Sequence, residues 1–192
     1  MSFNEISTTN DVLEGICLDG KRAVITGATG GLGIETARAL ASVGASVTIT
    51  GRNPEKIEAA LRTLRGSVPE ALFDAKTIDL ASLSSIKSAT TEMLAEDRPV
   101  DLLINNAGVM MSPEGKTEDG FETQFGTNHL GHFALTAGLM SIITKCARVI
   151  TLSSGAHLRG SVDLDDLNWE SREYDPNLAY AQSKTANAWF AV

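Results

Sequence analysis

Short apolar segments rich in β-branched residues alternate with segments of helical periodicity along most of this chain. Strands are expected at residues 22–26, 46–50, 75–78, 100–105 and 148–152. Helices are expected at 32–43, 54–65, 83–95, 118–144 and from 176 to the end. Such alternation builds parallel βαβ units with helices on both faces of the sheet. Because crossovers are right-handed, we predict a doubly wound, Rossmann-like α/β fold.

The length and composition fit one globular domain. The chain has 192 residues, and domains average roughly 150, so residues 1–192 are expected to form a single domain. Hydrophobic residues make up 43% and charged residues 21%, which excludes a disordered chain, a collagen and a disulfide-knotted mini-protein. The net charge of −8 argues against a nucleic-acid partner, which would require a basic surface.

The cysteines, histidines and N-terminus indicate no metal site and no membrane span. Cys17 and Cys146 are far apart and are interpreted as reduced, partly buried thiols. The three histidines have no cysteine partner and no HExxH spacing, so no metal is expected. The polar N-terminus does not resemble a signal peptide, and the longest apolar run, 133–144, is too short to cross a bilayer. A cytoplasmic location is therefore expected.

The first expected strand runs into a glycine-rich segment, TGATGGLG, at residues 26–33. Glycines here allow a tight turn and let a pyrophosphate approach main-chain N–H groups at a helix N-terminus. The position between a strand and an amphipathic helix favours a dinucleotide site, although a tight turn without a ligand is the alternative. The candidate cofactor-binding residues in this segment are Gly27, Thr29, Gly31, Leu32 and Gly33.

Arg52 follows the second expected strand, and no acidic residue precedes Glu55. An acidic side chain here would bind the ribose hydroxyl of NAD, whereas an arginine suits the 2′-phosphate of NADP. NADP is therefore the expected cofactor and NAD the less favoured one. A solvated surface arginine is the alternative interpretation.

Two further strand ends carry candidate cofactor residues. Asp79 and Leu80 follow the third strand, where the aspartate either accepts a hydrogen bond from an adenine amine or caps a helix. The segment 105–108, NNAG, follows the fourth strand. Its small residues suit a turn against a flat ligand, and a plain turn is the alternative. The candidates in this turn are Asn106, Ala107 and Gly108.

Tyr180 and Lys184 lie four residues apart on the last expected helix, and so share one helical face. An ammonium beside a phenol favours the phenolate and lowers the phenol pKa, which suits acid–base catalysis. A surface pair is the alternative. Ser154 follows the fifth strand and Asn128 lies in an apolar stripe, where ordinary loop chemistry and a satisfied core asparagine are the competing interpretations. No G-x-S-x-G elbow surrounds either Ser153 or Ser154, so a hydrolase is not supported.

Taken together, these motifs resemble the short-chain dehydrogenase/reductase family over about residues 19–192. The motifs that carry the resemblance, in chain order, are T-G-x-x-x-G-x-G, N-N-A-G, Asn128, Ser154 and Tyr180-x-x-x-Lys184. The segments TNHLGHF, SSGAH and YAQSKTAN resemble the retinol-dehydrogenase and WW-domain-oxidoreductase branch, although no WW domain is present.

The resemblance implies hydride transfer between NADP(H) and an alcohol/carbonyl substrate. Tyr180 would be the general acid in reduction, and Lys184 would lower its pKa and bind the nicotinamide ribose. Ser154 would hold the substrate oxygen, and Asn128 would hold a water that links Lys184 to solvent. The implied partner is a small molecule, for which Leu158, Leu164, Leu167 and Trp169 suggest an apolar wall.

With this resemblance, the strands are expected in the order third, second, first, fourth, fifth. The family's fold continues beyond the helix that carries Tyr180 and Lys184. The resemblance therefore implies that this chain is C-terminally incomplete and lacks the last strands and the substrate loop. A homo-oligomer through this helix is a possible assembly. The alternative function is a non-catalytic dinucleotide-binding protein or an inactive fragment.

Overall fold

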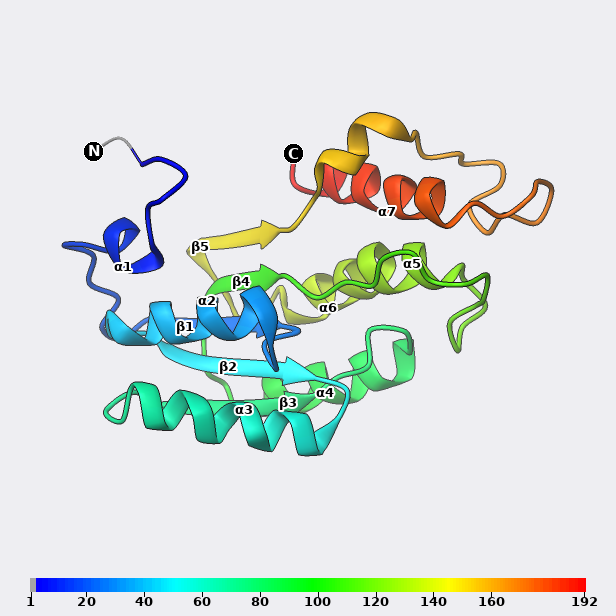
Figure 1. Ribbon diagram of the computed structural model, residues 1–192. Helices are drawn as coiled ribbons and strands as arrows, with labels where there is room; N and C mark the ends of the chain where they lie inside the picture. The colour runs from blue at the N-terminus through cyan, green and yellow to red at the C-terminus, as the bar shows by residue number, and fades with distance from the viewer. Residues whose placement is uncertain (1–2) are drawn as a thin grey trace.

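The computed structural model describes residues 3–192, and its centre is one five-stranded sheet with helices on both faces (Figure 1). The strands are β1 (Arg22–Thr26), β2 (Ser46–Gly51), β3 (Phe73–Thr77), β4 (Val100–Asn105) and β5 (Ile143–Thr151). Every pairing is parallel, and the order is β3-β2-β1-β4-β5. The predicted doubly wound, Rossmann-like α/β fold and its strand order are confirmed.

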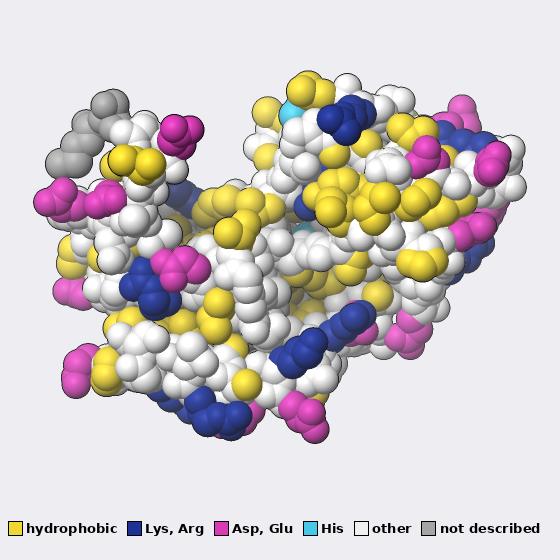
Figure 2. Space-filling view, in the orientation of Figure 1, with side chains coloured by type: hydrophobic (Ala, Val, Ile, Leu, Met, Phe, Trp, Pro, Cys, Tyr) yellow, Lys and Arg dark blue, Asp and Glu magenta, His cyan; other side chains and the backbone are white. Residues whose placement is uncertain are grey.

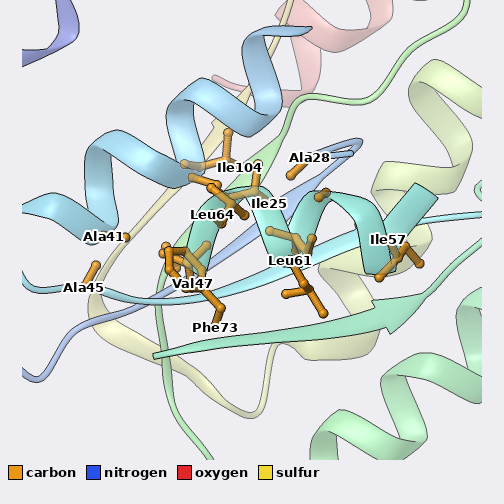
Figure 3. Close-up of a cluster of buried hydrophobic side chains, with 14 residues drawn as sticks. Ile25, Ala28, Ala41, Ala45, Val47, Ile57, Leu61, Leu64, Phe73 and Ile104 are labelled. Atoms are coloured by element: carbon orange, nitrogen blue, oxygen red, sulfur yellow. The ribbon is translucent and has the colours of Figure 1, made fainter. Parts of the chain in front are cut away.

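Helices α2 (Gly31–Ser42) and α3 (Pro54–Ser67) cover one face of the sheet, and their apolar side chains enclose β1 and β2 (Figure 3). Helices α4 (Leu83–Ala95) and α6 (Gly131–Leu139) cover the other face. α7 (Pro176–Phe190) lies on the far side of β5 from β1 (Figure 1). Asn53 caps α3 and Asp175 caps α7, each followed by proline at the first helical position, so the predicted cap-then-proline signals are confirmed.

The expected helix over 118–144 is wrong at both ends and interrupted within. The structure has α5 (Thr123–Phe125), a π-helical turn at Gly126–Leu130, and then α6. Upstream, Lys116 and Glu122 pair as an antiparallel bridge around Gly120, whose φ is +87°. Downstream, Ile143 already pairs with Val100, so β5 begins five residues before its expected start at 148. Pairing with a buried strand overrides the helical periodicity of these apolar residues.

Smaller differences concern the chain ends and the loops. β3 begins and ends slightly before the expected 75–78. A short helix, α1 (Thr9–Val12), and a 3-10 turn at Gly155–Arg159 were not predicted. Cys17 and Cys146 are free as expected, but both are exposed rather than partly buried. Within residues 3–192, no helix combines the length and apolarity needed to cross a membrane, and no group of three or more histidine, cysteine, aspartate or glutamate side chains could hold a metal ion.

Candidate active site

A cleft of about 440 Å³ lies at the carboxyl edge of the sheet, where the loops after β1, β2, β3 and β4 meet. It gathers ten of the predicted cofactor residues: Gly27, Thr29, Leu32, Gly33, Arg52, Asp79, Leu80, Asn106, Ala107 and Gly108. Gly31 does not line it. The cleft is completed by residues that we did not predict: Gly30, Thr50, Gly51, Ile78, Val109 and Thr127. Most of these directly flank a predicted motif, so adjacency was the only available signal.

Two glycines of the β1–α2 loop are required by close packing. Gly27 has φ +66°, and a Cβ there would lie 2.9 Å from the Cα of Ala107. A Cβ on Gly33 would lie 2.5 Å from the carbonyl oxygen of Gly27. The N-cap of α2 is Gly30, which offers no side chain to the first N–H groups of the helix. This helix end therefore presents free donors and the positive end of its dipole to the cleft.

A buried hydrogen-bond network joins the loops after β1 and β4. The Thr26 hydroxyl accepts from the backbone N–H groups of Asn106 and Ala107, each at 2.9 Å. Its oxygen lies 2.8 Å from Nε2 of His132, whose Nδ1 lies 2.8 Å from the carbonyl oxygen of Asn128. A carbonyl only accepts, so Nδ1 carries the proton and Nε2 accepts from Thr26. Burial lowers the pKa of His132 to about 4, which keeps the ring neutral.

Neither Thr26 nor His132 was predicted as a site residue. Their network positions the NNAG turn against the glycine-rich loop and also reaches the helix that contains Asn128. Thr26 and His132 are 106 residues apart. No local sequence pattern could have indicated this contact.

Arg52 and Asp79 lie on the wall of the cleft. Arg52 is exposed, and within residues 3–192 it makes no ion pair or side-chain hydrogen bond. Asp79 accepts a hydrogen bond from the N–H of Ala81 at 2.9 Å, while Ser82 provides the N-cap of α4. The helix-cap interpretation of Asp79 is therefore wrong. Its carboxylate shapes a turn at the cleft.

Tyr180 and Lys184 line a second cavity of about 230 Å³. It shares Leu32, Asn106, Gly108 and Val109 with the first cleft, so the two spaces are adjacent. The Nζ atom of Lys184 lies 5.7 Å from the centre of the Tyr180 ring and donates to the carbonyl oxygen of Leu152 at 2.9 Å. Lys184 is only 5% exposed, and burial lowers its pKa. In the predicted Tyr–Lys pair, Lys184 is thus buried and Tyr180 is half-buried, and both line a cavity.

Asn128 is completely buried in the π-helical turn, where both N–H groups of its side-chain amide are paired and Oδ1 accepts one hydrogen bond. Its Oδ1 accepts from the N–H of Val109 at 2.8 Å, and its Nδ2 donates to the carbonyl oxygen of Val109 and to Ser183. A Cβ on Gly108 would come within 3.2 Å of this amide and within 3.6 Å of Nζ of Lys184. Asn128 is therefore a satisfied core asparagine that also lies beside the catalytic lysine candidate.

A third cavity of about 580 Å³ begins on the other side of Tyr180 and contains Ser154. Its aliphatic side chains are Met110, Met111, Ala156, Leu178 and Ala181, and Arg159 and Asn177 also line it. The expected wall of Leu158, Leu164, Leu167 and Trp169 is absent from this lining. Leu158 and Leu164 are instead exposed to solvent, and Trp169 is buried outside this cavity. Met110 and Met111 come just after the NNAG turn and Val109 in the chain. Their closeness to this turn was the signal by which the sequence could have indicated them.

Comparison with known proteins agrees with this geometry. Residues 21–164 match the family described as short chain dehydrogenase. The chain is 47% identical over 175 residues to human retinol dehydrogenase 13, covering 90% of this chain and 53% of that protein. It is 40% identical over 179 residues to mouse polyprenol dehydrogenase, covering 90% and 53%. The chain thus spans about half of the length of these relatives.

A solved structure shows the same arrangement. A crystal structure of an uncharacterized protein from Mycobacterium paratuberculosis superposes with a TM-score of 0.82 at 47% identity, covering 91% of this chain and 61% of that one. With the family match and the strand order, this confirms the resemblance seen in the sequence. The chain belongs to the short-chain dehydrogenase/reductase family and resembles its retinol-dehydrogenase branch.

Proposed function

We propose that this protein transfers a hydride between NADP(H) and an alcohol/carbonyl substrate with apolar substituents. The observation that carries the proposal is the position of Tyr180, which lines both the cavity that contains Lys184 and the cavity that contains Ser154. A group at this junction can reach a cofactor on one side and a substrate on the other.

The first cleft fits a dinucleotide. The uncapped start of α2 suits a pyrophosphate, and the close approach of Gly27 to Ala107 leaves the loop backbone facing the cleft. Arg52 would pair with the 2′-phosphate of NADP, and Asp79 would accept from the adenine amine. Tyr180 and Lys184 would face the nicotinamide ribose. A bound nicotinamide cofactor supplies the hydride.

The residues of this chain supply the proton and the stabilisation of charge. In reduction, the carbonyl carbon gains a hydride and the oxygen gains a proton from the Tyr180 hydroxyl, which yields an alcohol and oxidised cofactor. Ser154 donates a hydrogen bond to the oxygen where negative charge develops. Lys184 stabilises the phenolate left on Tyr180. Asn128, beside Gly108 and Lys184, would place the water through which Lys184 exchanges protons with solvent.

The apolar substrate class is supported by the lining of the third cavity, where Met110, Met111 and Leu178 face Ser154 and Tyr180. Two relatives, retinol dehydrogenase 13 and polyprenol dehydrogenase, are named for alcohols with large hydrocarbon groups.

The second candidate is a dinucleotide-binding protein without turnover, which the first cleft by itself would also support. The test is NADPH oxidation by the full-length protein with aldehydes, run beside titrations of NADPH and NADH. Turnover that is lost in Tyr180→Phe, with NADPH affinity retained, supports the enzyme. Binding without turnover in the wild type supports the second candidate.

We also propose a reducing, cytoplasmic location, supported by two exposed free thiols, and a homo-oligomer through α7, supported by Trp189, which is 56% exposed on this helix. Cell fractionation and light scattering test these two proposals. Recovery in an oxidising compartment would contradict the first, and a monomeric mass would contradict the second.

A further inference from the structure

Met111, in the wall of the third cavity, has an unusual backbone conformation. Its φ is +58°, in the left-handed region that costs energy for any residue with a Cβ other than asparagine or aspartate. Its N–H donates to Oε1 of Gln124 at 3.0 Å. Strained residues persist where their surroundings hold them, and they cluster at ligand-binding sites.

Gln124 is completely buried, and both the oxygen and the nitrogen of its side-chain amide form hydrogen bonds. Its Nε2 donates to the carbonyl oxygen of Pro176 at 2.9 Å and to the Tyr174 hydroxyl at 3.0 Å. The orientation of the amide is determined by chemistry, because Pro176 offers only a carbonyl and Met111 offers only an N–H. Gln124 therefore connects the cavity wall to the first turn of α7, the helix that carries Tyr180.

The Tyr174 hydroxyl completes this network. It accepts from Gln124 and donates to Oε1 of Glu122 at 2.9 Å. Glu122 is also buried, accepts from the N–H groups of Gln124 and Phe125, and has no ion-pair partner within residues 3–192. A buried carboxylate needs such donors. Burial raises the pKa of Tyr174 to about 12, so the hydroxyl keeps its proton.

A second strained residue packs against the same network. Trp169 has φ +59° and meets the Tyr174 ring edge-on, with the ring centres 5.6 Å apart. Within residues 3–192, Asp97 is the only other non-glycine residue with positive φ. Of the three residues with positive φ, Met111 contacts Gln124 and Trp169 contacts Tyr174. The network therefore lies where the fold holds two residues in an unfavourable backbone conformation.

We propose that Tyr174 is a positioning residue for substrate selection, which acts through Gln124 to hold Met111 as the apolar wall of the substrate cavity. The substrate class is an aldehyde or ketone with an apolar chain, which lies along Met110, Met111 and Leu178 with its oxygen at Ser154 and Tyr180. This inference rests on the proposed function and adds to it the residues that select the substrate.

The test compares NADPH-dependent reduction of decanal and butanal by the full-length protein. We expect Met111→Ala to lower the preference for decanal by about 10-fold, the effect of losing apolar contacts in a substrate pocket, and mainly through KM. We expect Tyr174→Phe to lower the same preference several-fold, also through KM. Tyr174→Phe should retain kcat for butanal, and both variants should retain their affinity for NADPH.

A double variant separates positioning from general support of the fold. If Tyr174 acts through Met111, then Tyr174→Phe combined with Met111→Ala should show no lower preference than Met111→Ala alone. Additive losses, or an equal fall in kcat for both aldehydes in Tyr174→Phe, would overturn the inference. Thr63→Val is the matched control, because its exposed hydroxyl on α3 bonds only to the carbonyl oxygen of Ala59 and should change neither aldehyde.

If Tyr174→Phe does not fold, Met111→Ala alone still decides whether the wall selects the substrate, since Met111 is 48% exposed and its truncation leaves the buried network intact. Unchanged preference in Met111→Ala overturns the inference. A wild type that reduces neither aldehyde overturns both the proposed function and this inference. A Tyr180→Phe variant with full turnover overturns the proposed mechanism alone.

Discussion

The sheet has a β1–β2 side and a β5–α7 side, and different interactions hold each of these two regions together. On the β1–β2 side, apolar side chains of α2 and α3 enclose the strands, and Ile25, Val47 and Leu64 are almost completely buried (Figure 3). On the β5–α7 side, Val149 and Ile150 of β5 are 39% and 38% exposed, and hydrophobic side chains gather on the surface over α7 (Figure 2). The candidate catalytic residues lie on the second side.

The buried face of α7 is polar. Its buried residues include Gln182, Ser183, Lys184, Thr185 and Asn187. Lys184 and Asn187 both donate to the carbonyl oxygen of Leu152. The hydroxyl oxygen of Thr185 lies 2.6 Å from the carbonyl oxygen of Gly160. Hydrogen bonds are directional and contribute modest net stability, whereas apolar burial is non-directional and contributes more. The β1–β2 side therefore mainly stabilises the fold, whereas the β5–α7 side positions the candidate catalytic side chains.

The largest expected effect is on turnover and comes from the α7 side. Tyr180→Phe should lower kcat of the full-length enzyme by about 10²–10⁴-fold, because the general acid is removed. Folding and NADPH affinity should be retained, since one hydroxyl is lost. Lys184→Met should lower both turnover and NADPH affinity, and Lys184→Arg should rescue only in part, because a guanidinium differs in shape from an ammonium. Steady-state kinetics and thermal unfolding measure these effects, and full turnover in Tyr180→Phe would contradict the mechanism.

The next effect is on stability and comes from the β1–β2 side. Leu64→Ala should lower the free energy of unfolding by about 2–5 kcal/mol, because it leaves a cavity in the apolar cluster. Urea unfolding followed by circular dichroism measures it. Leu72→Ala is the matched control, since Leu72 is exposed and its truncation should change stability by less than about 0.5 kcal/mol. Equal losses in the two variants would break the contrast between the two sides.

The third effect is a pH dependence of the free energy of unfolding, and it comes from His132. Burial lowers the pKa of His132 from 6.5 to about 4 in the folded chain. The unfolded chain therefore binds more protons between these values, so stability is fully present above about pH 6.5 and falls as the pH drops towards 4. The expected loss is on the order of 3 kcal/mol.

The pH effect is measured as the difference in urea unfolding between wild type and His132→Gln at each pH, which separates it from the titration of other groups. His157→Gln, at an exposed histidine, is the control and should follow the wild type. A His132→Gln variant with the same pH dependence as the wild type would show that His132 does not link the loops in its neutral form.

The smallest expected effect is on cofactor choice. Arg52→Asp should weaken NADPH binding by about 1.5–3 kcal/mol, because a charge-assisted contact to the 2′-phosphate is lost, and it should favour NADH relatively. Fluorescence titration of both cofactors measures it. Arg62→Asp on α3, outside the cleft lining, should change neither affinity. Equal binding of NADPH and NADH by the wild type would make Arg52 a surface arginine only.

The sequence by itself determined the parallel sheet and the edge at which the site lies. These follow from local patterns: apolar strands, helices with caps and prolines, and glycines directly after β1. The Tyr180–Lys184 spacing also placed both residues on one helical face, and the structure shows them together at a cavity. Such features depend on residues that are close in the chain, so periodicity and spacing can reveal them.

The tertiary structure alone decided where the long predicted helix breaks, which side chains line the third cavity and what holds the loops together. β5 begins early because Ile143 finds Val100 as its partner. Thr26 meets His132 across 106 residues, and Gln124 meets Tyr174 across 50. Contacts between residues so far apart depend on how the whole chain packs, and they leave no spacing that a single sequence could show.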